Sequence, residues 1–576
     1  MRSFIYALVV AVAACLAAAA AAAADPGPIQ VSGQSAGTSQ QATAASSATQ
    51  VDPSNKNISI RVLSPGNDGA VSQSNNAASS AAAGNLGSTS QSANQAAGGS
   101  GIQSSQQAAG TDQVAAALSA ASQYDPSNKN VAIRVLSPGN DGSVTQSNNA
   151  ASRADAGNAA STTQSGSQSQ TGSSCGCDGS TPVQTSDQSA STDQTAAALS
   201  AAKQIDPSNT NVSVRVLSPG NGGSVSQSNN AASSADAGNL AATTQNASQS
   251  QAGGCGCGGD AIQQANQQAG TEQGALAASA AIQADPSNVD SPVRVLSPGS
   301  DGSVHQSNNA ASSAFAGNGA ATTQNANQYQ GGESCRCGDG LGIQVAGQKS
   351  ETEQSSAALS AALQLFGDDH SRCGCGGSSG NNASPVRVLS PGSDGSVDQS
   401  NNADSSAIAG NLAATTQNGT QSESGSGIQV LGQQAETAQD ALAASLAAQF
   451  DPSNTASPVR VWSPGGNGSV NQSNSAASSA AAGNGASTRQ DGRQSISGKS
   501  CGCAQLPIQV AGQWAGTAQL APAFSAAAQV HPSNDAGGTS VWSPGTAGQL
   551  SQSNWDGSRG DAVNGNRSAQ GVSQAA

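Results

Sequence analysis

The chain has 576 residues, of which 35% are hydrophobic, 2% aromatic and 9% charged, and its formal net charge is −15. Because the hydrophobic residues are mostly Ala, the chain lacks the Leu, Ile, Val and Phe that fill the core of an ordinary globular domain. The acidic balance and the absence of Lys/Arg clusters argue against nucleic acid as a partner.

Residues 1–24 have the pattern of a secretory signal peptide. Arg2 supplies the positive charge, Phe4 to Leu16 the apolar stretch, and the Ala run ending at Ala24 a small-residue cleavage site. The alternatives are an uncleaved membrane anchor, because the stretch is long enough to span a bilayer, and lipidation at Cys15. The pattern predicts a secreted or cell-surface protein that meets a membrane only through this segment.

Residues 25–539 are predicted to form a repeat array, and with the last copy the chain holds seven copies of one unit of roughly 75 to 90 residues. In each unit the residues at every second position keep their identity from copy to copy, whereas the positions between them vary. A period of two with one invariant face is typical of a strand whose invariant face is packed. Helix is the competing interpretation for "AAALSAA", since Ala and Leu favour helix locally.

The invariant face predicts an all-β fold, an elongated β-solenoid (β-helix) of seven internal repeats with Gln, Asn, Ser, Thr and Ala ladders inside. Identical amides stacked from rung to rung can donate to one neighbour and accept from the other. The representative ladder residues are Gln73, Asn75, Asn85, Thr89, Gln91, Gln146, Asn148, Asn158, Gln164, Gln227, Asn229, Asn239 and Gln245.

Two kinds of turn divide each unit into three segments. Asp-Pro-Ser-Asn, as at Asp52, places Pro at the second turn position, and Ser-Pro-Gly-Asn-Asp-Gly supplies a second bend. If each segment is one rung, the seven units make about 21 rungs and a rod on the order of 100 Å long.

Ten cysteines form five Cys-x-Cys pairs. They are Cys175, Cys177, Cys255, Cys257, Cys335, Cys337, Cys373, Cys375, Cys501 and Cys503. An even number of cysteines in an exported chain indicates disulfides. With three rungs per unit, neighbouring pairs would lie roughly 14 Å apart, beyond the ~7 Å limit for a bridge. We therefore expect bridges within a pair or between molecules, with zinc binding and redox chemistry as alternatives.

An arginine begins six copies of the Arg-Val-Leu-Ser-Pro-Gly motif or its variants. These residues are Arg61, Arg134, Arg215, Arg294, Arg387 and Arg460. Each is expected to pair with the Asp of the following turn, as Arg61 with Asp68. The alternative is an anion-binding stripe for polysaccharide. No acid, base and nucleophile stand at workable spacing, so the sequence predicts neither an enzyme nor a cofactor.

Residues 540–576 form a degenerate last repeat. Asp556 stands where every earlier copy has Ala, and Trp542 and Trp555 add bulk that is rare elsewhere. Terminal repeats of solenoids are commonly atypical because they must close the core against water. This segment is therefore predicted to be a C-terminal cap, with decay of an unconstrained last repeat as the alternative.

A Gly-Asn-x-Ala-x-x-x-Gln motif recurs in the array, for example at Gly157–Gln164 and Gly238–Gln245. It resembles the second half of the curlin repeat, found in bacterial extracellular amyloid fibres. The resemblance implies a β-solenoid with inward Gln and Asn ladders, secretion, and fibre assembly in a biofilm matrix.

The expected function is that of a secreted or cell-surface structural protein whose main partner is another copy of itself. One alternative is a solenoid that binds surface polysaccharide or ice. A disordered, flexible surface spacer is another, because the chain is poor in bulky residues and rich in Gly and Ser.

Overall fold

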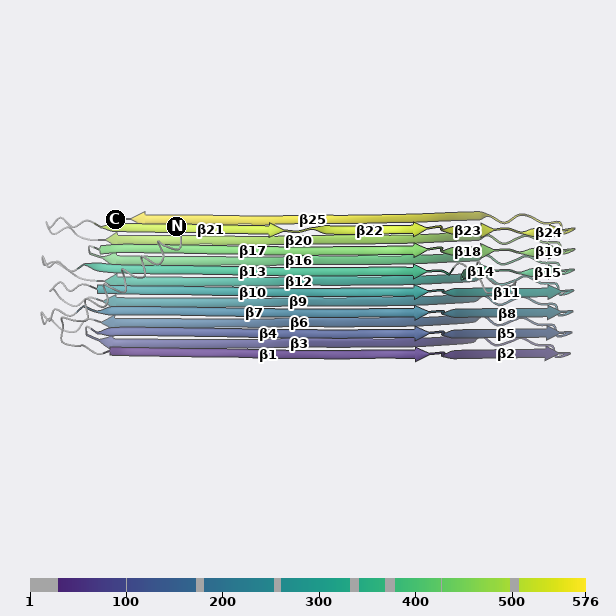
Figure 1. Ribbon diagram of the computed structural model, residues 1–576, viewed down its shortest axis with the longest axis horizontal. Helices are drawn as coiled ribbons and strands as arrows, with labels where there is room; N and C mark the ends of the chain where they lie inside the picture. The colour runs from purple at the N-terminus through teal and green to yellow at the C-terminus, as the bar shows by residue number, and fades with distance from the viewer. Residues whose placement is uncertain are drawn as a thin grey trace.

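The computed structural model describes residues 29–99, 101–171, 181–252, 261–331, 341–367, 379–425, 427–497 and 507–575. These residues form strands and connecting bends, and the strands belong to three parallel sheets, named A, B and C here (Figure 1). None of the described segments is a helix of the length and hydropathy that crossing a bilayer requires.

Each sheet takes strands from all seven repeats. Sheet A consists of β1 (Ile29–Val51), β4 (Ile102–Tyr124), β7 (Val183–Ile205), β10 (Ala261–Ala284), β13 (Gly342–Leu365), β17 (Gly427–Phe450), β21 (Ile508–Leu520) and β22 (Ala523–Val530). Sheet B consists of β2 (Ser54–Val62), β5 (Ser127–Val135), β8 (Ser208–Val216), β11 (Ser287–Val295), β14 (Gly380–Ala383), β15 (Val386–Val388), β18 (Ser453–Ala456), β19 (Val459–Val461), β23 (Ser533–Ala536) and β24 (Thr539–Val541). Sheet C consists of β3 (Val71–Gly98), β6 (Val144–Thr171), β9 (Val225–Ala252), β12 (Val304–Gly331), β16 (Val397–Ser424), β20 (Val470–Ser497) and β25 (Leu550–Ala575).

One repeat forms one rung of the solenoid. Ile29 pairs with Ile102, and Gln73 pairs with Gln146, so each residue lies beside its equivalent in the next repeat. The prediction of three rungs per repeat, and of a rod along the stacking axis, is therefore wrong. At ~4.8 Å per rung the seven rungs span only about 30 Å, whereas a strand of 28 residues spans roughly 90 Å. The long axis in Figure 1 accordingly runs along the strands.

Within a rung the chain runs out along sheet A, continues through sheet B and returns along sheet C. Sheets A and C face each other, and their side chains meet between them. Gln34 Nε2 in sheet A donates to the carbonyl of Ser92 in sheet C (2.7 Å). Hydroxyls alternate across the same gap, because Ser119 Oγ donates to Ser79 Oγ (2.9 Å) and Ser79 Oγ donates to Ser46 Oγ (2.9 Å). The molecule is therefore a flattened, two-layered coil.

Side chains alternate strictly between the core and the surface, as the two-residue period predicts. The buried apolar residues are almost all Ala, for example Ala115 and Ala154, each fully buried. Small residues let the two layers approach closely, and identical neighbours fill each column. The predicted β-solenoid with internal ladders is confirmed, and the helical interpretation of "AAALSAA" is wrong. A disordered spacer does not fit the described segments, because they form continuous strands.

An Asp-Pro step joins sheet A to sheet B without reversing the chain. Asp52 has a φ of 50°, and Asp125, Asp206, Asp285 and Asp451 repeat this left-handed conformation. Asp tolerates this region better than most residues, and the following Pro fixes the re-entry into a strand. The bend changes the direction of the chain while the residues on either side keep pairing with the next rung.

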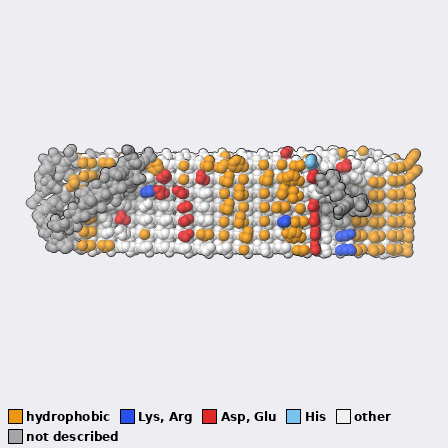
Figure 2. Space-filling view, in the orientation of Figure 1, with side chains coloured by type: hydrophobic (Ala, Val, Ile, Leu, Met, Phe, Trp, Pro, Cys, Tyr) orange, Lys and Arg blue, Asp and Glu red, His pale blue; other side chains and the backbone are white. Residues whose placement is uncertain are grey.

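The outer surface shows the same register. On sheet A, Asp112 pairs with Asp193, and Glu272 pairs with Asp193 and Glu353, so these acids form one exposed column. Figure 2 shows acidic side chains aligned across the strands and hydrophobic side chains in columns at the end formed by sheet B. Those columns contain the outward Val and Leu residues of the Arg-Val-Leu motif. The core and the surface are thus both built from stacked equivalents.

Candidate functional site

The six motif arginines point into the coil from sheet B. Alternation on this short strand places Val on the outside and Arg on the inside, as in Val135 and Arg134. Arg134, Arg215, Arg294, Arg387 and Arg460 are at most 1% exposed and are the largest fully buried side chains of the described residues. The first guanidinium, that of Arg61, lies at the open end of the stack and is partly exposed.

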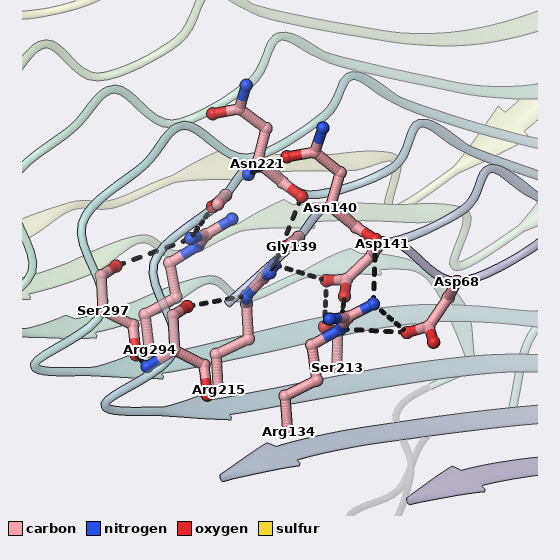
Figure 3. A network of polar contacts seen from close by, with 12 residues as sticks. Asp68, Arg134, Gly139, Asn140, Asp141, Ser213, Arg215, Asn221, Arg294 and Ser297 are labelled. Atoms are coloured by element: carbon pink, nitrogen blue, oxygen red, sulfur yellow. Dashed lines mark hydrogen bonds and ion pairs between the residues drawn. The ribbon is translucent and has the colours of Figure 1, made fainter. Parts of the chain in front are cut away.

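The loop after each arginine folds back over it (Figure 3). Leu136 has a φ of 53° and Gly139 a φ of 142°, and these two left-handed residues reverse the chain toward sheet C. A Cβ on Gly139 would lie 2.0 Å from the carbonyl oxygen of Gly66, so the close approach of successive loops requires glycine. The turn thereby brings backbone carbonyls and one carboxylate to the guanidinium.

Arg134 illustrates how a buried guanidinium is satisfied. Its Nη1 donates to the carbonyl of Gly66 (2.7 Å), and its Nη2 donates to the carbonyl of Asn140 (2.9 Å). The guanidinium also pairs with two carboxylates, Asp141 of its own rung (2.8 Å) and Asp68 of the previous rung (2.9 Å). Multiple charge-assisted hydrogen bonds offset the loss of hydration that burial imposes on an arginine.

Turn carboxylates bridge successive rungs. Asp68 pairs with Arg61 (2.6 Å) and Arg134 (2.9 Å), and Asp394 pairs with Arg387 (2.6 Å) and Arg460 (3.1 Å). The predicted pair of Arg61 with Asp68 is present. Sequence reasoning missed the second half of each bridge, although the Asp recurs at one position after the motif and could have indicated it. We call this arrangement the Arg–Asp column.

The Arg–Asp column does not form the surface stripe for polysaccharide that the sequence allowed. Five of the six guanidiniums are buried and engaged with carbonyls and carboxylates of the chain itself, so a polymer outside the coil cannot reach them. Burial lowers the pKa of Arg215 to about 10, while Asp141 opposes and Arg294 adds to the decrease. The arginine remains charged at neutral pH, and its role within the described rungs is to hold sheet B to the returning loop.

The amide ladders occupy the inner faces of all three sheets. All thirteen ladder residues named above lie on the inner face of sheet C, twelve of them buried and Asn85 half-buried. Gln146 Nε2 donates to Gln73 Oε1 (2.8 Å), and Asn75 Nδ2 donates to Asn148 Oδ1 (2.9 Å). Thr89 Oγ1 faces Thr38 Oγ1 across the layers (3.4 Å). In sheet C the second amide hydrogen goes to a backbone carbonyl, as Gln146 Nε2 donates to the Thr210 carbonyl (3.1 Å), so burial of these polar groups is compensated.

The two kinds of amide ladder have opposite polarity. Most inner Gln residues donate toward the previous rung, as Gln103 does to Gln30, and Gln509 in the last rung does to Gln429. Inner Asn residues donate toward the next rung, as Asn484 does to Asn564. The sequence gives no signal for this direction, because it depends on how each amide rotates against the facing backbone.

The polarity leaves different groups open at the two ends of the stack. At the end formed by the first repeat, Gln amide hydrogens and Asn oxygens lack a ladder neighbour. At the other end, formed by the last repeat, Gln oxygens and Asn amide hydrogens lack one. One end face therefore offers the groups that complement the other.

The ten paired cysteines and the predicted signal segment lie outside the described residues. The spacing used to limit disulfides to one pair is nevertheless wrong, because it assumed three rungs per repeat. Described residues that flank successive pairs, such as Thr171 and Ala252, pair in adjacent rungs. Adjacent parallel strands lie ~4.8 Å apart, within the range of a disulfide. Disulfides between neighbouring repeats are therefore a further alternative to disulfides within a pair or between molecules.

One acid interrupts an inner Asn ladder. Asp290 follows Asn57, Asn130 and Asn211 in register, and Asn211 Nδ2 donates to its Oδ1 (2.7 Å). Burial raises the pKa of Asp290 to about 7, whereas the Asn211 hydrogen bond opposes the increase. The folded protein therefore binds this proton more tightly than the unfolded chain does. The resulting stabilisation is complete below the pKa of the unfolded chain and is lost as the pH rises through the pKa of the folded state.

The Asp290→Asn variant should therefore be more stable than the wild type at pH 8 and equally stable below about pH 4. A pKa rise from 3.8 to about 7 corresponds to roughly 4 kcal/mol in the alkaline limit, and the new amide continues the ladder. Urea unfolding between pH 4 and 8 measures the difference. Asp440→Asn, on the outer face, is the control and should parallel the wild type. A pH-independent difference for Asp290→Asn would contradict the assignment.

Comparisons with protein-family models, with curated proteins and with solved structures found no match to this chain. Within the described residues, no group of three or more His, Cys, Asp or Glu side chains is arranged to hold a metal ion.

Proposed function

We propose that this protein is a secreted or cell-surface structural protein that assembles head to tail into fibres. The observation that carries the proposal is the complementarity of the two end faces. Open Gln donors of the first rung would meet open Gln acceptors of the last rung of another copy, and Asn acceptors would meet Asn donors. Both ends also present unpaired strand edges, which are templates for further pairing.

On sheet A, Gln residues at the two ends match along the columns. Sheet A presents Gln34 and Gln40 in the first rung, and Gln513 and Gln519 in the equivalent columns of the last rung. A second copy placed on the end would therefore continue the same solenoid in register. Such a contact is heterologous and does not close, so repetition gives a filament rather than a ring. The resemblance to curlin repeats and the predicted signal peptide support the same proposal.

Reversing the polarity of the first rung tests the proposal. In the double variant Gln34→Glu/Gln40→Glu, the carboxylate oxygens replace donors and would face the Gln oxygens of the next copy. Each new carboxylate still accepts from Gln107 or Gln113, and the hydrogen bonds lost to Ser92 and Leu86 cost about 1 kcal/mol each. The variant should fold but remain monomeric where the wild type forms fibres.

The matched control carries the same charge outward. Ser35→Glu/Gln41→Glu changes the two neighbouring residues, whose side chains are exposed on the same strand. This control should still assemble. Sedimentation velocity, cross-β diffraction and thioflavin fluorescence in oxidising buffer report the outcome. A wild-type protein that stays monomeric at high concentration, or equal assembly of the two double variants, would contradict head-to-tail growth.

The outer face of sheet C favours a second candidate, binding to a periodic surface such as polysaccharide or ice. One outer column holds serine in all seven rungs: Ser74, Ser147, Ser228, Ser307, Ser400, Ser473 and Ser553. Beside it lies a column of outward-facing Asn residues, in which Asn149 Nδ2 donates to Asn76 Oδ1 (2.8 Å). The following rungs continue this column. Retention of the monomeric double variant on a glycan resin or on ice would favour this candidate over fibre assembly.

A further inference from the structure

The third rung breaks the pattern of the Arg–Asp column. Gly222 occupies the position that Asp68, Asp141, Asp301 and Asp394 hold in rungs one, two, four and five. The register is unchanged there, because Arg215 pairs with Arg294 and the Gly222 amide donates to the Ser300 carbonyl (2.8 Å). The backbone of the turn is therefore kept while its carboxylate is missing.

Two buried arginines lose a partner at this position. Arg134 and Arg387 each pair with two carboxylates, one from their own rung and one from the previous rung. Among the described residues, Arg215 pairs only with Asp141, and Arg294 pairs only with Asp301. Both guanidiniums are 1% exposed, so bulk water does not replace the missing carboxylate.

Arg387, which has a carboxylate from the previous rung, shows where the missing carboxylate would lie beside Arg294. Nη2 of Arg387 donates to the Ser393 carbonyl (2.8 Å) and pairs with Asp301 of the previous rung (2.9 Å). Nη2 of Arg294 donates to the Ser300 carbonyl (2.9 Å), and Gly222 stands where the previous-rung carboxylate would be. A Cβ built on Gly222 would lie 3.4 Å from this Nη2. The second hydrogen of Nη2 thus points at the gap.

The charge of the column supports an anion at this gap. The six arginines face four turn carboxylates, since the sixth and seventh turns carry Asn467 and Ala547 at the Asp position. Neighbouring guanidiniums repel one another, and Arg215 and Arg294 each have one carboxylate where Arg134 has two. Arg keeps its charge even when buried, so neutralisation by loss of a proton does not relieve the deficit.

A cavity leads to the gap. A channel of about 340 Å³ follows the inner side of sheet B, and its lining includes Gly222 and Arg294 together with the carboxylates of Asp141, Asp290 and Asp301. It also reaches Arg61 and Asp68 in the first rung, which forms one open end of the stack. A water molecule occupies about 30 Å³ of liquid, so an ion of similar size fits.

We propose that a small monovalent anion, such as chloride, binds at Gly222 in place of the missing carboxylate, held by Nη2 of Arg294 and the guanidinium of Arg215. The anion completes the alternation of charge along the column in the middle of the stack. This site is independent of fibre assembly, because it lies inside a single copy.

Thermal unfolding in sodium chloride and in sodium gluconate at equal ionic strength tests the proposal. The wild type should melt at a higher temperature in chloride, with a saturating dependence on chloride concentration. Gly222→Asp supplies the carboxylate from the chain and should abolish this dependence. Asn221→Asp is the matched control, because its added charge is exposed and its side chain can still accept from the Ser300 amide. It should keep the chloride dependence.

Bromide locates the site directly and does not require Gly222→Asp to fold. Crystals of the wild type and of Asn221→Asp grown in sodium bromide should both show an anomalous peak within hydrogen-bonding distance of Arg294 Nη2. The absence of bromide at this position in the wild type would overturn the proposal. So would a chloride dependence that is the same in the wild type and in a folded Gly222→Asp.

Discussion

Replacement of Asp301 by Ala should destabilise the fold by about 3–5 kcal/mol, the cost of breaking a buried ion pair from one side. Asp301 bridges Arg294 (2.5 Å) and Arg387 (2.9 Å), and both guanidiniums are at most 1% exposed. After the substitution, Arg294 has no carboxylate partner among the described residues, and Arg387 retains only Asp394. The effect is large because the arginines cannot turn out to water without opening sheet B.

Urea unfolding of Asp301→Ala against the wild type measures the loss. Asp236→Ala is the matched control, since Asp236 pairs with Arg153 of the previous rung (3.2 Å) but lies on the surface. Exposed ion pairs contribute about 0–1 kcal/mol, so this control should change little. Equal effects of the two substitutions would show that the Arg–Asp column does not stabilise the fold as its burial implies.

Deletion of residues 540–576 should lower solubility and speed fibre growth. The deletion removes β25 and exposes β20, whose inner face carries Gln472, Asn474 and Ala476 in the unbroken ladder columns. In the intact chain, Asp556 pairs with Ala476 and places a carboxylate in the column of alanines. An incoming copy would have to bury that charge against Ala77 without a partner, at a cost of several kcal/mol. The predicted role of this segment as a cap follows from that penalty.

A point substitution isolates the carboxylate from the rest of the cap. Asp556→Ala should accelerate growth by about tenfold or more, because each ~1.4 kcal/mol removed from an association changes its equilibrium constant tenfold. Asp561→Ala, which removes an outward acid paired with Arg559 (2.7 Å), is the control and should assemble like the wild type. If the truncated chain and Asp556→Ala are as soluble and as slow to assemble as the full chain, the last repeat is not a cap.

The class of the fold and the residues of its core are predictable from the sequence alone. Strict alternation with an invariant face predicts strands, and repetition of that face predicts ladders of Gln, Asn, Ser, Thr and Ala. Both depend on local geometry, because successive side chains of a strand point to opposite sides. The turn motifs also marked the two bends of the first rung correctly, at Asp52 and after Leu63.

The number of rungs per repeat depends on which strands pair in the folded chain. All three segments of a repeat share the two-residue period, so the period does not reveal which strands become neighbours. Pairing Gln73 with Gln146 stacks identical residues across the full repeat, whereas stacking the segments of one repeat would place unlike residues together. The rise of the stack follows from that choice.

The tertiary structure also determines which face of sheet B is buried. Alternation separates Arg134 from Val135, and hydrophobicity alone would bury the valine. The folded-back loop instead surrounds the guanidinium with the carbonyls of Gly66 and Asn140 and with two carboxylates, which compensates for its burial. Those groups come from two different repeats. Their convergence exists only when the rungs are stacked, and the same stacking sets the polarity of the amide ladders and the character of each end.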